Sequence, residues 1–194
     1  MRKTIFFLLF IPFWGFSHSA QLSTFALVKD EKGVWTIHVS ASLSAFQIAL
    51  ADQKINSAEE FQKTLIQWAR KSIHISAGLL NSISLEKGSV HLGHQTDLKF
   101  TVKGMPSKLE SFSVENQILQ QLSGHAMVFK VIYPPSESNQ VVLTSSNDFS
   151  ANVRVKSTGI IIEPKSNFTY LYLLFIIPFI LICLFLLKRS STQG

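Results

Sequence analysis

The chain has 194 residues, with 18 lysines and arginines, 12 aspartates and glutamates, and a formal net charge of +6. Four of the basic residues lie at the two ends, so residues 21–167 hold 14 basic and 12 acidic side chains. A segment this close to neutral, without a cluster of lysines and arginines, gives no basis for nucleic-acid binding. The one cysteine, Cys183, lies outside this segment, which excludes an internal disulfide and thiolate chemistry there.

The start of the chain has the layout of a secretory signal peptide. Arg2-Lys3 precede an apolar run over residues 5–16, and small residues follow. This order predicts a signal peptide over residues 1–20, cleaved after residue 19 or 20, and an exported mature chain. The alternative is an uncleaved anchor, because cleavage after residue 20 would place His18 three residues upstream of the cut.

Two apolar runs come next, and a short charged connector separates them. The runs are Leu22–Lys29 and Val34–Ser40, and the connector ends in Gly33. The second run mixes β-branched and aromatic residues, and the connector is short enough for a hairpin. The sequence therefore predicts an antiparallel pair of strands. Residues 43–50 continue the apolar material as a less regular segment, either a bulged strand or a turn of helix.

A helix is expected after Ser57. Ser57 and Glu60 have the spacing of a capping box, in which the hydroxyl accepts from a free backbone N–H and the carboxylate reaches back to the cap. Phe61, Leu65 and Trp68 then follow at the spacing of one helix face. The pattern predicts an amphipathic helix packed on a sheet, with Trp68 in the core.

From residue 72 onward, apolar residues recur mainly at every second position. Residues 98–103 alternate Leu, Phe and Val with Lys and Thr, and residues 127–133 form the most strongly β-prone run. Such alternation is typical of strands with one solvated face. We therefore expect a mainly β (α+β) domain over residues 21–155, an antiparallel β-sandwich-like fold with one amphipathic helix.

The C-terminal part is expected to hold a linker and a membrane span. Residues 156–167 contain Gly159 and Pro164 and are predicted to form a stalk. Residues 168–187 carry no charge, and twenty residues at about 1.5 Å each can cross the roughly 30 Å hydrocarbon core as a helix. The sequence therefore predicts one C-terminal transmembrane helix.

The residues around this span indicate its orientation. Tyr170 and Tyr172 lie near its start, where aromatic rings favour the headgroup zone, and Lys188 and Arg189 follow its end, as is typical of the cytoplasmic side. Pro178 lies within the span, where a kink is tolerated. We expect a single-pass protein of the bacterial inner (cytoplasmic) membrane, with residues 188–194 as a cytoplasmic tail and the exported domain in the periplasm.

A polar cluster in the middle of the chain contains candidate metal ligands. His91, His94 and Asp97 lie close in sequence around Gly93, and His125 is a candidate further ligand. Imidazole and carboxylate groups bind zinc, copper or nickel, and a turn at Gly93 would let the two histidines converge. The alternative is that His94 and Asp97 hydrogen-bond a turn between strands and fix its register.

Four short segments give the chain a family resemblance. These are Gly93–Phe100, Gly104–Pro106, Ser113–Asn116 and Val142–Thr144. They resemble an uncharacterised family of small envelope domains from Gram-negative, Bacteroidota-like bacteria, and similar domains precede the membrane portion of some HupE/UreJ-like proteins, a group associated with metal transport. The resemblance covers residues 25–155, but the transporter bundle has no counterpart here. It implies an exported β-rich envelope domain and supplies no catalytic residues.

The sequence contains no catalytic signature. It has no Gly-x-Ser-x-Gly elbow, no His-Glu-x-x-His helix, no phosphate-binding glycine loop and no dinucleotide fingerprint. We therefore expect a non-enzymatic, membrane-tethered module for protein association, or an accessory of an envelope system, whose partners are the membrane and another envelope or membrane protein. The alternative is a metal-binding accessory or sensor domain linked to metal transport.

Overall fold

The computed structural model describes residues 22–78, 83–106, 109–133, 136–137, 139–157 and 159–165. Its elements are β1 Leu22–Lys29, β2 Trp35–Ser42, α1 Leu43–Ala49, α2 Ala58–Ser72, β3 Ile73–Ser76, β4 Ser84–His91, β5 Gln95–Lys103, β6 Ser111–Asn116, β7 Ala126–Tyr133, β8 Ser136–Glu137, β9 Val141–Leu143, the 3-10 turn η1 Ser145–Asn147, β10 Ser150–Lys156 and β11 Gly159–Pro164. Strands predominate, so the predicted mainly β class is confirmed.

The predicted signal peptide, transmembrane helix and cytoplasmic tail lie outside the described residues. So do the residues assigned to the membrane anchor, which are Tyr170, Tyr172, Pro178, Lys188 and Arg189. Within the described part of the chain, no helix is both long enough and apolar enough to span a bilayer.

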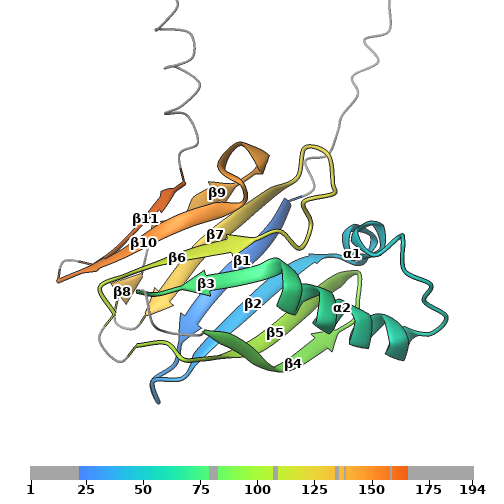
Figure 1. Ribbon diagram of the computed structural model, residues 1–194, viewed down its shortest axis with the longest axis horizontal. Helices are drawn as coiled ribbons and strands as arrows, with labels where there is room; N and C mark the ends of the chain where they lie inside the picture. Colours follow the sequence, from blue (N-terminus) through green and yellow to red (C-terminus); the bar gives the residue numbers. More distant parts are fainter. Residues whose placement is uncertain are drawn as a thin grey trace, which may run out of the picture.

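Two sheets form the domain (Figure 1). The larger sheet has the strand order β4-β5-β2-β1-β7-β8, with β9 also paired to β7, and the smaller has the order β11-β10-β6-β3. β1 and β2 are antiparallel, with Phe25 opposite Val39, which confirms the predicted pair. β1 and β7 run parallel, with Leu22 opposite Ala126, so the larger sheet is mixed rather than antiparallel throughout. Alternation in a sequence identifies a strand but not its neighbour, which explains this error.

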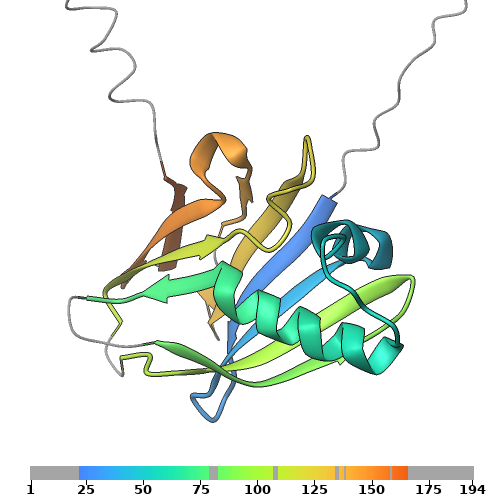
Figure 2. The same cartoon turned by 45° about the vertical axis from the view of Figure 1, so that its right-hand side comes forward.

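The smaller sheet and α2 together form a second layer over the larger sheet (Figures 1 and 2). α2 runs directly into β3, so the helix covers one part of the larger sheet and the smaller sheet covers another. One hydrophobic cluster fills the space between the layers. It includes Phe25 and Phe129, whose ring centroids lie 4.9 Å apart, and Val114 and Val153 of the smaller sheet.

Residues 43–49, for which the sequence allowed a strand or a turn of helix, form α1. Ser42 caps this helix, because its Oγ accepts a hydrogen bond from the Ala45 backbone N at 3.2 Å. Phe46 is fully buried and holds α1 against the core, whereas Ile48 is 49% exposed. The helix therefore packs through one face only.

α2 begins after Ser57, as predicted. The Ser57 Oγ accepts from the Glu60 backbone N at 3.1 Å. The Glu60 carboxylate accepts from the Asn56 backbone N at 2.8 Å, one residue before the position that the capping-box prediction implied. Leu65 is fully buried, whereas Trp68 is half-buried and donates its Nε1–H to the Ile118 carbonyl at 3.0 Å. Trp68 therefore lies at the edge of the core rather than inside it.

β11 occupies residues that the sequence assigned to a stalk, so that prediction is wrong. It pairs with β10, with Ile162 opposite Val153, and both isoleucines that face inward, Ile160 and Ile162, are buried. The Asn139 side chain completes the pairing, because Ile162 N donates to its Oδ1 at 2.8 Å and its Nδ2 donates to Ile162 O at 2.9 Å. The residues that indicated a linker, Gly159 and Pro164, stand at the two ends of this strand.

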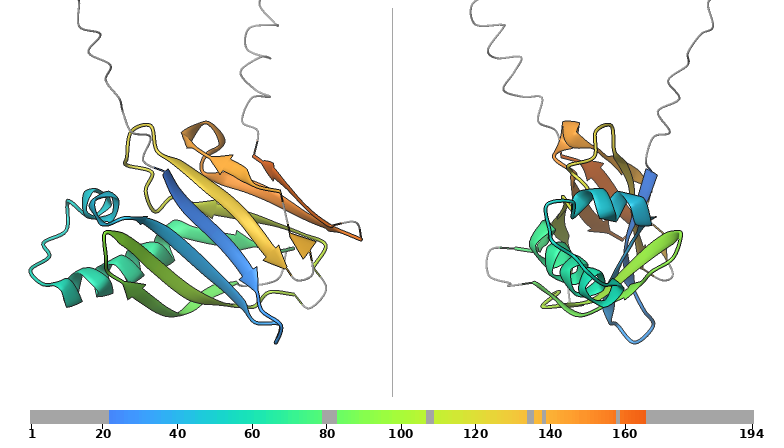
Figure 3. Two further views of the ribbon diagram at one scale, coloured as in Figure 1. Left: turned by 180° about the vertical axis from the view of Figure 1, so that it is seen from behind. Right: turned by 90° about the vertical axis from the view of Figure 1, so that its right-hand side faces the viewer.

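β1 begins and β11 ends at the same end of the molecule, toward the top of Figures 1 and 3. Two loops lie beside these points, residues 117–125 before β7 and residues 144–149 before β10. We call Leu22, these two loops and Lys165 the proximal end. The connector between β1 and β2, residues 30–33, lies at the opposite end of the molecule, and together with Lys29 it is called the distal end.

Candidate functional site

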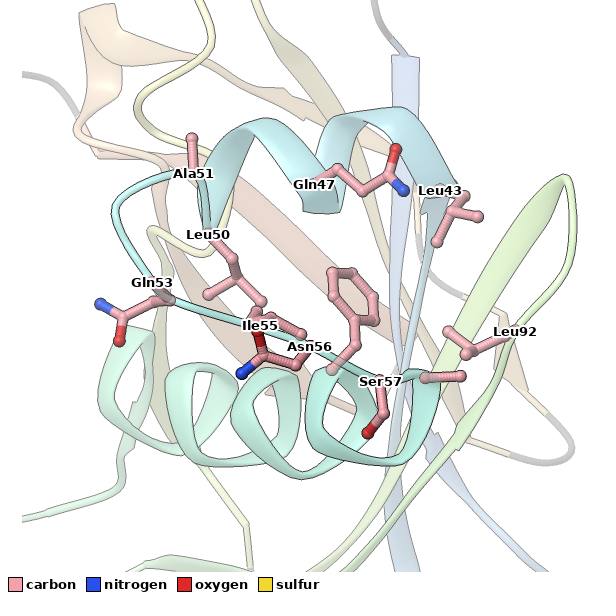
Figure 4. A pocket seen from close by; sticks show the side chains of 11 residues that line it. Leu43, Gln47, Leu50, Ala51, Gln53, Ile55, Asn56, Ser57 and Leu92 are labelled. Atoms are coloured by element: carbon pink, nitrogen blue, oxygen red, sulfur yellow. The ribbon is translucent and has the colours of Figure 1, made fainter.

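A groove of about 490 Å³ lies between α1, the segment that joins α1 to α2, and the start of α2 (Figure 4). Its lining consists of apolar side chains, amides and one hydroxyl, and includes Leu43, Gln47, Leu50, Ala51, Gln53, Ile55, Asn56, Ser57, Ala58, Phe61 and Leu92. None of these side chains is ionisable. The groove therefore presents an apolar wall with neutral hydrogen-bonding groups.

Three elements meet to form this groove, and hydrogen bonds to backbone carbonyls fix their positions. The Leu43 backbone N donates to the His94 carbonyl at 3.1 Å, which ties the start of α1 to the turn between β4 and β5. Thr96 is fully buried and holds the same turn by donating its Oγ1–H to the Gly93 carbonyl at 3.1 Å. Gln62 of α2 reaches the Val90 carbonyl at 3.3 Å. Leu92 is thereby held against the mouth of the groove.

The described lining residues offer apolar surface and neutral hydrogen-bonding groups. General acid and base catalysis requires a titratable side chain within hydrogen-bond reach of the reacting group. The amides of Gln47, Gln53 and Asn56 donate and accept hydrogen bonds but do not titrate at physiological pH. The Ser57 hydroxyl is already used as the acceptor that caps α2. The groove is thus suited to an uncharged group with apolar surface and peptide-like polar atoms.

The structure places the four predicted metal ligands on different elements. His91 at the end of β4 lies opposite Asp97 of β5, and both side chains are exposed. His94 is exposed in the turn between them. His125 is 4% exposed, hydrogen-bonds Ser23 Oγ through Nε2 at 3.0 Å, and stacks on Phe149 with ring centroids 6.1 Å apart.

These four residues do not form one site. Asp97 lies opposite Ser40, Ser40 opposite Thr24, and Thr24 opposite Val128 of β7, the strand that begins directly after His125. Three strand spacings of about 4.8 Å separate β5 from β7 by roughly 14 Å, whereas zinc ligands lie within about 2.3 Å of the metal. Among the described residues, no group of three His, Cys, Asp or Glu side chains could hold a metal ion. The prediction of a four-residue metal site is therefore wrong.

Asp97 instead links two strands. Its carboxylate accepts from Ser40 Oγ of β2, and Ser40 Oγ accepts from Gln95 Nε2 at 3.0 Å. The turn itself is held by Thr96 rather than by His94. These bonds between side chains thus fix the register of β2 and β5.

His38 lies two residues before Ser40, on the same face of β2. Burial lowers the pKa of His38, the nearby Lys99 lowers it further, and Asp97 opposes the shift.

A scan of the chain against models of protein families and a search of curated proteins found no match. The resemblance to bacterial envelope domains therefore stays a prediction.

Sequence reasoning missed the groove between α1 and α2. Its polar lining, Gln47, Gln53 and Asn56, has the composition of an ordinary surface. Its apolar lining combines Leu43 with Leu92, which are far apart in the sequence and meet because the turn between β4 and β5 bonds to the start of α1. The only local signal was the irregular apolar segment 43–50.

Proposed function

We propose that this chain is an exported, membrane-anchored protein of the bacterial envelope whose β-rich domain binds a partner protein through the groove between α1 and α2. The observation that carries this proposal is the groove itself, about 490 Å³ in volume, in which the described lining residues offer apolar side chains, amides and one hydroxyl and none is ionisable. Such a lining accepts an apolar side chain together with the backbone polar groups beside it. The partner is expected to be another envelope or membrane protein.

The ends of the described domain support export and anchoring. β1, the first element of the described residues, begins at Leu22, within three residues of the predicted cleavage site. The uncharged residues 168–187 follow the last described residue, Lys165, after a gap of two. With Lys188 and Arg189 in the cytoplasm, the domain lies in the periplasm, anchored in the inner membrane by one transmembrane helix.

The partner's chemistry follows from the groove. Phe61 and Leu92 offer partly exposed apolar surface, and Gln53 offers an exposed amide at the rim. Burying apolar surface contributes about 25 cal/mol per Å², whereas burying an unpaired charge would oppose binding. We therefore expect an uncharged segment of the partner with at least one large apolar residue. Metal binding is not favoured, because no group of three His, Cys, Asp or Glu side chains in the described part of the chain could hold a metal ion.

The test is site-specific photo-crosslinking of the full-length protein in its native membranes. A photoreactive residue at Gln53, on the rim of the groove, should give one discrete protein adduct. The same residue at Lys63, on the exposed side of α2, should not. Leu92→Asn in the lining should reduce the Gln53 adduct at least severalfold.

A matched variant separates this effect from a general surface change. Ile48→Asn makes the same kind of replacement at an exposed residue of α1 outside the lining and should leave the adduct intact. Equal adducts from Gln53 and Lys63, or a Gln53 adduct indifferent to Leu92→Asn, would contradict partner binding at the groove.

A further inference from the structure

The distance between the domain and the predicted membrane span is short because β11 replaces the expected stalk. The Lys165 backbone N donates to the Ser150 carbonyl at 3.0 Å, so the chain is fixed to the domain at this residue. The predicted span begins at Phe168, three residue steps later. An extended chain covers at most about 3.6 Å per step, which allows roughly 11 Å. The headgroup layer on one side of a bilayer is itself roughly 5–7 Å thick.

The loops at the proximal end carry few charged side chains, as is expected for a surface held close to the bilayer. Residues 117–125 contain no Asp, Glu, Lys or Arg, and the exposed side chains of this loop include Gln120, Gln121 and Ser123. The other loop, residues 144–149, adds exposed serines and one charged residue, Asp148. Placing few charges beside the bilayer limits the cost of removing water from them.

Leu22 adds an apolar contact to the proximal end. Its side chain is 59% exposed at the start of β1, opposite Ala126, although the neighbouring Ser23 is buried. A leucine that remains exposed in the isolated domain can bury its side chain at the boundary between headgroups and acyl chains. Lys165 supplies an exposed cation at the same end, which favours phosphate groups.

We propose that the proximal end docks directly on the phospholipid headgroups of the bilayer, so that the domain stands on the membrane rather than on a flexible stalk. This inference rests on the anchor of the proposed function. The occupant of the surface is a layer of phosphate-bearing headgroups, contacted by neutral amides and hydroxyls, by Leu22 and by Lys165. The groove between α1 and α2 then keeps a fixed orientation relative to the membrane.

The test uses the full-length protein in vesicles of phosphatidylethanolamine and phosphatidylglycerol that contain a Ni²⁺-chelating lipid. Spin labels are placed on single cysteines, in a Cys183→Ser background, at Ser145 (proximal), Lys32 (distal) and Phe168 (start of the span). Headgroup-bound Ni²⁺ should enhance relaxation at Ser145 at least severalfold more than at Lys32. Equal, weak enhancement at Ser145 and Lys32 with a strong lipid signal at Phe168 would overturn docking and leave the anchor standing. A weak signal at Phe168 as well would overturn both.

A linker insertion distinguishes the affinity of the proximal end for headgroups from closeness that the short connection alone imposes. Ten Gly and Ser residues inserted between Ser166 and Asn167 free the domain from the short connection. A docking surface should keep most of the enhancement at Ser145, and Gln121→Glu should then reduce it at least twofold because the bilayer is anionic. The matched variant Gln67→Glu, on the exposed side of α2, should have no effect. Loss of the Ser145 enhancement on linker insertion alone would overturn the proposal.

Discussion

The proximal and distal ends of the domain differ in how their loops are held. At the distal end charged groups do this, because Asp30 Oδ1 accepts from the Val34 backbone N at 2.7 Å and Lys29 Nζ lies 4.6 Å from the centre of the Tyr133 ring. At the proximal end buried neutral groups do it, because Asn147 Oδ1 accepts from Thr144 N at 2.9 Å and its Nδ2 donates to the Val142 carbonyl at 3.0 Å.

The two ends are therefore suited to different surroundings. A loop held by exposed ions depends on water to solvate them, and its charges are screened by salt. A loop held by buried amides is satisfied internally and can leave its outer surface uncharged. The same two sheets thus carry one end adapted to water and one end that can approach a lipid surface.

The greatest loss of stability should follow from weakening β11, the strand that brings the chain to the proximal end. Ile162→Ala in β11 removes a side chain that is 2% exposed, and should lower the free energy of unfolding by about 2–5 kcal/mol. The measurement is urea unfolding of the detergent-solubilised protein, followed by tryptophan fluorescence. Ile161→Ala, its half-buried neighbour on the other face, should cost clearly less. Equal effects would mean that β11 is a linker after all.

A smaller effect distinguishes the two kinds of loop. Asn147→Ala removes a buried side chain that serves two backbone groups and should cost about 2 kcal/mol, because both groups lose a partner. Asp30→Ala at the distal end removes an exposed acceptor and should cost no more than about 1 kcal/mol. High salt should change the stability difference between each variant and its parent by less than the difference itself. A larger loss of stability in Asp30→Ala than in Asn147→Ala would contradict the view that buried neutral groups hold the proximal loop more firmly than exposed charges hold the distal one.

The smallest effect is a pH dependence at His38, which lies on the outer face of the larger sheet between the two ends. Its pKa is lowered by burial, so the unfolded chain binds the proton at a higher pH than the folded domain does. Stability should therefore be lost as the pH falls through the ordinary histidine value of about 6.5 toward the folded pKa. The His38→Gln variant should lose less stability than the parent between pH 7.5 and pH 5.5. An identical loss would show that His38 does not contribute.

The elements that the sequence predicted well are those with local signals. The alternation in residues 98–103 identified β5 and its buried face, and Ser57 with Glu60 identified the start of α2. Errors arose where a local signal had a second meaning. Gly159 and Pro164 indicated a linker, but they are the first and last residues of β11. The buried isoleucines of this strand pair with β10.

The candidate site was harder to predict because it depends on contacts between distant residues. His125 was grouped with His91 on chemistry alone, and only the strand order places them on opposite sides of β5, β2 and β1. The groove needs the bond between the start of α1 and the turn that carries His94, for which the sequence has no motif. The sequence shows which side chains could bind a metal ion or a partner, but it does not show which of them lie close together in the fold.

A pair of fusions tests whether the domain is exported and anchored at its proximal end. Alkaline phosphatase, which becomes active only after export, is fused after Lys165 in one protein and after Gly194 in the other. We expect activity from the first fusion and none from the second, because residues 168–187 would place the second reporter in the cytoplasm. Activity only after Gly194 would reverse the orientation, and activity at both positions would show that the segment does not span the membrane.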